Sequence, residues 1–207
     1  MKTGSLIILE GIDGFGGETH SRFLKDFFDK NNIPSVFVKS PDYDHPVGKL
    51  YSDYLHEKFD LSTEQVFLVC ATDVLNSVKK IKEGLKDKVV IADRYITSTI
   101  AYQCANGFSF ENALKLVDLL KYPKANLIIF IDIKPETSMR RKMEEHGKLD
   151  KYEGNLEFLR KVREFFLKEI EENVLGKWVT INGERSIDEV HKDILNTINS
   201  FNLINLE

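Results

Sequence analysis

The stretch Ser5–Thr19, SLIILEGIDGFGGET, decides the fold of this chain. It begins with the apolar run Ser5–Leu9, which is typical of a buried strand, and continues into the glycine-rich segment Glu10–Thr19. An amphipathic pattern over Thr19–Asn31 follows directly. A glycine-rich loop between a strand and a helix offers unpaired backbone N–H groups to a phosphate. A flexible turn without a ligand is the alternative, but the position of the loop favours a phosphate site.

The end of this loop departs from the usual phosphate-binding pattern G-x-x-x-x-G-K-[ST], which starts here at Gly11 and reaches Gly16. Gly17 and Glu18 then stand where lysine and a hydroxyl residue are expected; sliding the register by one residue moves Glu18 and Thr19 into those positions. Lysine normally neutralises phosphate charge during transfer. A carboxylate about 4 Å from a phosphate charge is repelled by roughly 4 kcal/mol at an effective dielectric constant near 20. Alternatively, Glu18 holds magnesium through its oxygens.

Strand-like runs and amphipathic stretches alternate along the rest of the chain. Further strands are predicted at Ser35–Lys39, Val89–Ala92, Asn126–Ile133 and Trp178–Ile181. Helices are predicted at Thr19–Asn31, Val47–Phe59, Ser62–Lys86, Thr97–Tyr122, Pro135–Glu145, Leu156–Glu172 and Ser186–Phe201, with Ser62 and Ser186 as N-caps. This alternation predicts βαβ units in a doubly wound parallel sheet. Because no repeat or linker interrupts it, we predict a single domain over residues 1–207.

Composition and charge narrow the class of protein. The 207 residues suffice for one domain with a full core, and 42% hydrophobic with 30% charged residues is an ordinary globular composition. The formal net charge of −4 argues against a surface built to bind nucleic acid. Two cysteines are too few for a disulfide framework, and no apolar stretch approaches the roughly 18 residues that span a membrane. We therefore expect a cytoplasmic protein without nucleic-acid or membrane partners.

Two further groups of residues have the chemistry of a phosphate site. Asp93 and Arg94 follow the apolar run Val89–Ala92, and ligands of α/β proteins bind at this edge of the sheet. Asp93 would organise a magnesium ion or, alternatively, cap a helix, while Arg94 suits a bidentate phosphate clamp. A basic cluster at residues 140–151 lies around Gly147. It predicts a lid over about residues 140–155 that brings positive charge to the phosphates; a solvated helix face is the alternative.

Five segments resemble thymidylate kinases and fall in the order of that family: Glu10–Gly16, Lys39–Leu50, Ile81–Leu85, Asp93–Gln103 and Gly147–Glu153. The resemblance implies a P-loop NTPase fold, an α/β doubly wound sheet of five parallel strands in the order 2-3-1-4-5, flanked by helices and carrying a small lid. It implies transfer of the γ-phosphoryl group of ATP to dTMP with Mg²⁺, which gives dTDP and ADP. It also implies a homodimer that packs through long helices such as Ser62–Lys86.

The resemblance further implies roles for individual residues. Catalytic roles fall to Asp93, Arg94, Lys39, Arg141 and Lys151. Binding of the donor nucleotide falls to Gly11, Asp13, Gly14, Phe15, Gly16, Gly17, Glu18, Thr19 and Arg140. Binding of the acceptor nucleotide falls to Asp13, Lys39, Cys70, Val74, Arg94, Ser98, Tyr102 and Tyr152, although Tyr102 is as easily a core residue. Binding of the metal ion is assigned to Glu18 and Asp93.

Several of these positions differ from the family. Cys70 stands where the family has a phenylalanine that stacks on thymine, and Val74 where it has an arginine that binds this base. Either Lys39 or Tyr43 replaces the arginine for the acceptor phosphate, and Lys151 replaces a lid arginine. Three functions therefore stay open: a kinase with altered acceptor preference, a weak or inactive homologue that binds nucleotide or regulates, and a scaffold recruited to another task. We favour the first.

Overall fold

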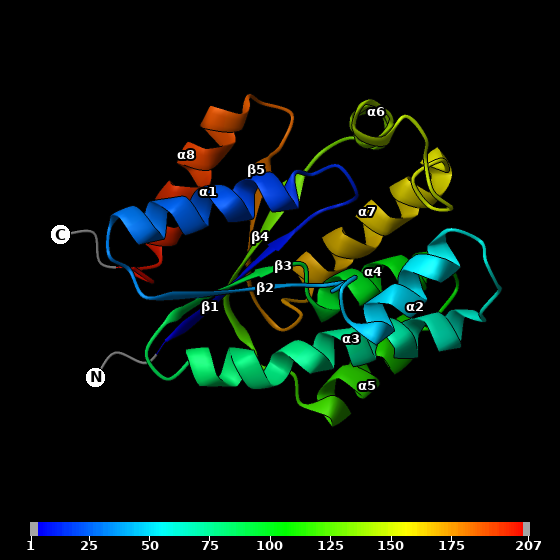
Figure 1. Ribbon diagram of the computed structural model, residues 1–207, viewed down its shortest axis with the longest axis horizontal. Coiled ribbons are helices and arrows are strands. Elements are labelled where there is room, and N and C mark those ends of the chain that lie inside the picture. The colour runs from blue at the N-terminus through cyan, green and yellow to red at the C-terminus, as the bar shows by residue number, and fades with distance from the viewer. Residues whose placement is uncertain (1–3, 205–207) are drawn as a thin grey trace.

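A five-stranded parallel sheet forms the centre of the protein (Figure 1). The structure is a computed structural model that describes residues 4–204. The strands are β1 (Ser5–Glu10), β2 (Ser35–Lys39), β3 (Val89–Asp93), β4 (Ala125–Asp132) and β5 (Gly176–Asn182). They lie in the order β2-β3-β1-β4-β5, and all paired strands are parallel. The predicted fold class and strand order are confirmed.

The central strand β1 is buried on both faces of the sheet. Ile7 and Leu9 belong to one hydrophobic cluster, whereas Leu6 and Ile8 belong to another, and all of these side chains are fully buried. Successive side chains of a strand point to opposite faces, so a strand covered on both sides reads as a continuous apolar run. This is why SLIIL shows no alternation of polar and apolar residues.

Helices cover both faces of the sheet. They are α1 (Gly17–Lys30), α2 (Pro46–Leu55), α3 (Thr63–Gly84), α4 (Ile96–Ala105), α5 (Phe110–Leu120), α6 (Pro135–His146), α7 (Leu156–Glu171) and α8 (Ile187–Ser200). Helices α1 and α8 lie on one face, and α3, α4 and α5 lie on the other (Figure 1). The predicted N-caps are confirmed, because Ser62 and Ser186 each form a capping box at the start of α3 and α8.

The prediction of one helix over Thr97–Tyr122 is wrong, because this stretch contains the separate helices α4 and α5. Gly107 lies between them with a φ of 99°, a left-handed conformation that ends a helix and that glycine adopts without strain. Ser109 then begins α5 by accepting a hydrogen bond from the backbone N–H of Asn112. Apolar residues continue across the break, since Phe108 stacks on Phe67 with ring centroids 4.5 Å apart. The apolar pattern therefore concealed the turn.

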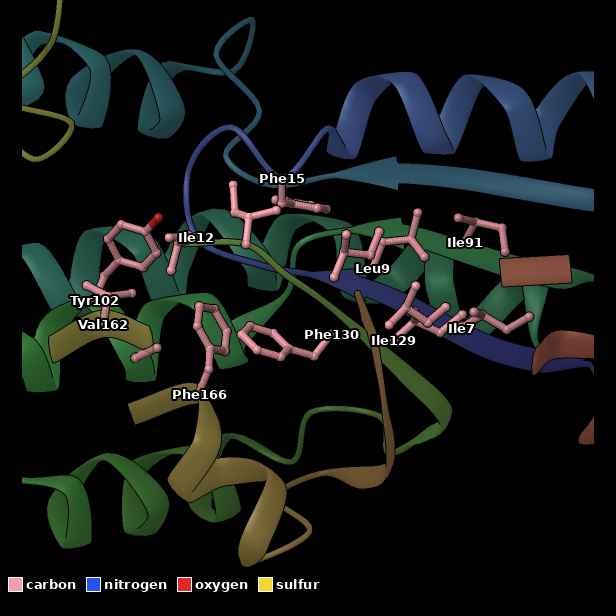
Figure 2. Close-up of a cluster of buried hydrophobic side chains, with 14 of the residues drawn as sticks. Ile7, Leu9, Ile12, Phe15, Ile91, Tyr102, Ile129, Phe130, Val162 and Phe166 are labelled. Carbon is pink, nitrogen blue, oxygen red and sulfur yellow. The ribbon is translucent and has the colours of Figure 1, made fainter. Parts of the chain in front are cut away.

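The glycine-rich loop is anchored to the core by its two apolar residues. Ile12 and Phe15 are 1% and 2% exposed and lie above the carboxyl end of β1 (Figure 2). Tyr102 of α4 belongs to the same cluster, and its ring meets Phe166 edge-on at 6.5 Å between centroids. Because these side chains leave the loop little freedom, its backbone is held at the edge of the sheet before any ligand arrives.

Candidate active site

A cavity of about 850 Å³ opens at the carboxyl ends of β1, β2 and β3. Its walls come from the glycine-rich loop, α2, α3, α4, α6 and the segments that follow β3 and β5. Its volume is in the range of small-molecule sites, and its position is the one where open α/β sheets bind ligands.

The cavity brings together most of the residues singled out in the sequence. The lining contains Asp13, Gly14, Phe15, Gly16, Gly17, Glu18, Thr19, Lys39, Cys70, Val74, Asp93, Arg94, Ser98, Tyr102, Arg140, Arg141 and Tyr152. Gly11, at the start of the loop, does not line the cavity, and its carbonyl accepts a hydrogen bond from Arg94. Lys151 does not line the cavity, because its ammonium group lies 4.4 Å from the centre of the Tyr54 ring and 3.9 Å from the Asp60 carboxylate. In this structure Lys151 is therefore not placed for the predicted catalytic role.

The start of α1 is crowded at Gly17, the first position where the loop pattern expects a lysine. Gly16 adopts a φ of 91°, and the helix begins at Gly17, so its first-turn N–H groups are directed into the cavity. A Cβ atom on Gly17 would lie 2.2 Å from Oδ1 of Asp93 and 2.6 Å from the Phe15 ring. Any side chain at this position would displace Asp93. The glycine at residue 17 therefore allows the Asp93 carboxylate to lie close to the start of α1.

Asp93 ends β3 as a nearly buried carboxyl group beside this helix start. Burial raises the pKa of Asp93, the nearby Arg94 and Lys39 charges oppose the rise, and Glu18 adds to it. Lys39 is the register partner of Asp93 on β2, and its ammonium group forms an ion pair with Glu18 at 3.2 Å. Two carboxylates and one ammonium group thus gather at the start of α1.

Arg94 is fixed in place by three hydrogen bonds. Its guanidinium group donates to the carbonyl of Gly11 at 2.7 Å, to the Ser98 hydroxyl at 3.0 Å and to the Asp13 carboxylate at 2.8 Å. It also lies 5.0 Å above the centre of the Phe15 ring. The guanidinium is therefore oriented in advance at the wall of the cavity, as a phosphate clamp requires.

Glu10 is a buried residue at the end of β1 that the sequence interpretation did not treat as a separate feature. It is fully buried and accepts hydrogen bonds from the Tyr95 N–H at 2.9 Å and from the hydroxyls of Thr97 and Ser98 at 2.5 Å each. Burial raises the pKa of Glu10, while Arg94 and these donors oppose the rise. Glu10 thus ties the end of β1 to the start of α4. A carboxylate that directly follows an apolar strand was the available signal.

One end of the cavity lies between α2, α3 and α4. The predicted residues Cys70 and Val74 form part of this wall, together with Tyr51 and Gln103, which the sequence interpretation missed. Burial, with the Asp73 carboxylate nearby, raises the pKa of the Cys70 thiol, which therefore stays neutral. The fully buried carboxamide of Gln103 has no hydrogen-bond partner among residues 4–204. An unpaired buried amide is a group that a polar ligand would satisfy.

The other end of the cavity lies between α6 and the start of α8. Arg141 donates to the carbonyl of Gly14 at 3.1 Å and to that of Gly183 at 2.9 Å, and so joins the lid helix to the glycine-rich loop. Arg185 and Ile187, which the sequence interpretation did not single out, complete this wall. They follow β5, so their place at the carboxyl end of a parallel strand was the available signal.

The segment after α6, which the sequence predicts to be part of a lid, is held by its own acidic residues. Asp150 accepts hydrogen bonds from the backbone N–H groups of Tyr152 at 2.8 Å and Glu153 at 2.9 Å. Burial raises the pKa of Asp150 to about 6. Lys142 forms ion pairs with Glu145 at 2.8 Å and with Glu153 at 3.3 Å. The charge of Lys142, one cation of the predicted lid, is therefore already paired with two glutamates in this conformation.

His20 supports the loop from behind and gives a testable pH dependence. Its ring is 4% exposed, lies against Gly16 and meets His191 edge-on. Burial, and then the neighbouring His191, lower the pKa of His20 from 6.5 to about 4. The native state therefore binds fewer protons than the unfolded chain between these values. This contribution to stability is complete above about pH 6.5 and is lost as the pH falls to about 4.

We expect His20→Gln to remove this pH-dependent contribution. Between pH 7 and pH 4, the wild type should lose about 3 kcal/mol more of its unfolding free energy than the variant does. Urea unfolding of both proteins at several pH values measures this difference. A difference that stays constant with pH would show that His20 titrates normally in the folded protein.

The carboxylates at the start of α1 fit a magnesium ion. Magnesium is usually held by one or two carboxylates together with the phosphates of a substrate. Glu18 and Asp93 supply two, and among the described residues no group of three or more His, Cys, Asp and Glu forms a separate metal site.

The comparisons with known proteins agree with this geometry. A parallel sheet in the order β2-β3-β1-β4-β5, with a glycine-rich loop between β1 and α1, defines a P-loop NTPase fold. A family model for thymidylate kinase matches residues 9–194. The chain belongs to the thymidylate kinase family, whose members are nucleotide-binding phosphotransferases.

Named relatives come from distant organisms. A probable thymidylate kinase of Pyrococcus abyssi is 33% identical over 199 residues, which covers 93% of this chain and 94% of that protein. The thymidylate kinase of Danio rerio is 30% identical over 195 residues, with coverages of 93% and 89%. The solved structure of thymidylate kinase from Candida albicans superposes with a TM-score of 0.76 at 26% identity, and covers 99% of this chain and 96% of that one. No helix among residues 4–204 is long and apolar enough to cross a membrane.

Proposed function

We propose that this protein catalyses the ATP-dependent phosphorylation of dTMP to dTDP. The observation that carries the proposal is the convergence of the α1 N-terminus, Asp93 and Arg94 on one cavity. Helix N–H groups, a carboxylate and a fixed guanidinium are the groups that a phosphoryl transfer needs. Family membership supports the same reaction.

In the proposed reaction the glycine-rich loop holds the phosphates of ATP and Arg94 orients phosphate groups between donor and acceptor. An oxygen of the dTMP phosphate bonds to the γ-phosphorus, the bond from this phosphorus to the β–γ bridging oxygen breaks, and ADP leaves with that electron pair. Asp13 would meet the sugar of the acceptor, and Arg140 and Arg141 would lie against the donor. Mg²⁺, held by Glu18 and Asp93, would supply positive charge to the phosphates.

The identity of the acceptor base is also proposed. Cys70 and Val74 line the cavity at the positions where the resemblance implies a phenylalanine and an arginine that bind thymine. The Candida albicans structure is described as revealing an origin of broad substrate specificity. The test is a coupled assay with Mg-ATP and, in turn, dTMP, dUMP, UMP, CMP and AMP. We expect dTMP to give the highest kcat/KM. A higher value with another monophosphate would replace dTMP as the acceptor.

The alternative function is a weak or inactive homologue that binds nucleotide or regulates a partner, which the missing loop lysine favours. Nucleotide binding without turnover in the same assay would establish this alternative.

We also propose that the protein works in the cytoplasm as a homodimer packed through α3. Leu68 of α3 is 53% exposed and is therefore available to such a contact. Sedimentation of the purified chain tests the dimer, and a monomer at micromolar concentration would overturn it.

A further inference from the structure

The central question that the proposed function leaves open is which cation replaces the loop lysine. Among residues 4–204, six cationic side chains other than histidine line the cavity: Lys39, Arg94, Arg140, Arg141, Lys142 and Arg185. The replacement must lie close to the start of α1, where the loop lysine would stand and where the helix N–H groups meet phosphate.

Five of these six cations make their contacts outside the first turn of α1. Arg94 donates to Gly11, Asp13 and Ser98. Arg141 has both terminal nitrogens on backbone carbonyls, and Lys142 is paired with two glutamates. Arg140 pairs with Glu144 on the lid helix, and Arg185 pairs with Asp193 of α8. None of these contacts involves the first turn of α1.

Lys39 is the cation at the start of α1. Its carboxylate partner is Glu18, the second residue of this helix, at 3.2 Å. Its backbone is the register partner of Asp93, whose carboxylate fills the space beside Gly17. The ammonium group therefore lies beside the first turn of α1, where the usual loop lysine would also stand.

We propose that Lys39, positioned by Glu18, supplies the positive charge that the loop lacks and contacts the phosphates of the donor nucleotide. This inference rests on the proposed function, and it changes the role of Lys39 from a clamp on the acceptor phosphate to a clamp on ATP. It also gives a reason for Glu18, since a carboxylate in the first turn of α1 draws the ammonium group toward the loop. The ion pair is exposed, so phosphate oxygens can reach the ammonium group without breaking into the core.

The test measures binding to the donor and acceptor sites separately. We compare wild type, Lys39→Ala and the control Lys25→Ala, whose lysine lies on α1 outside the cavity. The probes for calorimetry are the Mg²⁺ complex of the β,γ-imido analogue of ATP, and dTMP. We expect Lys39→Ala to raise the Kd for the ATP analogue by about 10- to 100-fold and to leave the Kd for dTMP within about twofold. Lys25→Ala should leave both unchanged.

A second variant separates lost charge from a damaged fold. Lys39→Arg keeps a cation on β2 and leaves Glu18 in place, and we expect it to keep most of the affinity for the ATP analogue that Lys39→Ala loses. If Lys39→Arg loses as much affinity as Lys39→Ala, charge at this place is not what the loop needs and the proposal is wrong.

The remaining outcomes distinguish failure of this inference from failure of the proposed function. Weaker dTMP binding with unchanged binding of the ATP analogue would make Lys39 an acceptor clamp. Unchanged binding of both would make Lys39 and Glu18 a surface ion pair only. Either result overturns the inference and leaves the kinase in place. A wild-type protein that binds neither nucleotide would overturn the proposed function itself.

Discussion

Asp93→Asn is expected to reduce turnover by roughly 10³-fold, which corresponds to about 4 kcal/mol of activation free energy. Asparagine keeps the shape of the side chain but removes the negative charge that we propose holds the metal beside the donor phosphates. The fold should tolerate the change, because burial already raises the pKa of Asp93 and thus disfavours its charged form. Coupled turnover assays and urea unfolding measure the two effects separately.

Asp132→Asn is the matched control for this prediction. Asp132 is the last residue of β4, as Asp93 is the last residue of β3. The Asp132 carboxylate lies outside the cavity and pairs with Arg163 at 2.6 Å. We expect this variant to lose about 1 kcal/mol of stability and to keep its turnover within about twofold. Equal losses of turnover in both variants would contradict a specific role of Asp93.

Arg94→Lys is expected to reduce turnover by about 10²- to 10³-fold and stability by about 3 kcal/mol. Lysine keeps the positive charge but cannot hold Gly11, Asp13 and Ser98 together, as the guanidinium does. The Asp13 carboxylate would lose the guanidinium that it meets at 2.8 Å, and Ser98, which bonds the fully buried Glu10, would lose its donor. Stability and turnover should therefore fall together in this variant.

Arg160→Lys is the control for this substitution. Arg160 lies on the surface of α7 and pairs with Glu136 at 2.6 Å. Replacing it should change neither turnover nor the unfolding free energy measurably, since exposed ion pairs contribute little. If Arg94→Lys kept full turnover, the fixed guanidinium would not be the phosphate clamp proposed above.

The fold was predictable because its signals are local and agree with one another. Continuous apolar runs in β1, β3 and β4 indicate strands covered on both faces, and the helical stretches between them require parallel pairing. The break at Gly107 was missed because the apolar pattern runs through it to Phe108. A turn whose side chains still pack in the core leaves little trace in periodicity.

The sequence predicted those residues of the site that belong to a recognisable motif, and it did not predict the others. The loop and Asp93–Arg94 stand directly after strands, so their place at the sheet edge follows from the sequence. Tyr51 and Gln103 lie inside helical patterns, where a side chain that lines a cavity looks the same as one that packs in the core. The orientation of Lys151 toward Tyr54 depends on contacts between distant segments, which spacing along the chain does not encode.

The central claim is that the chain transfers phosphate although its loop lacks a lysine. The most direct measurement is the time course of dTDP formation from Mg-ATP and dTMP, followed by ion-exchange chromatography, with wild type and Asp93→Asn in parallel. We predict that the wild type forms dTDP at about 1–10 per second, within the usual range of enzymes, and that Asp93→Asn forms almost none. If the wild type binds both nucleotides by calorimetry but forms no dTDP, the chain is a nucleotide-binding homologue and the kinase account is contradicted.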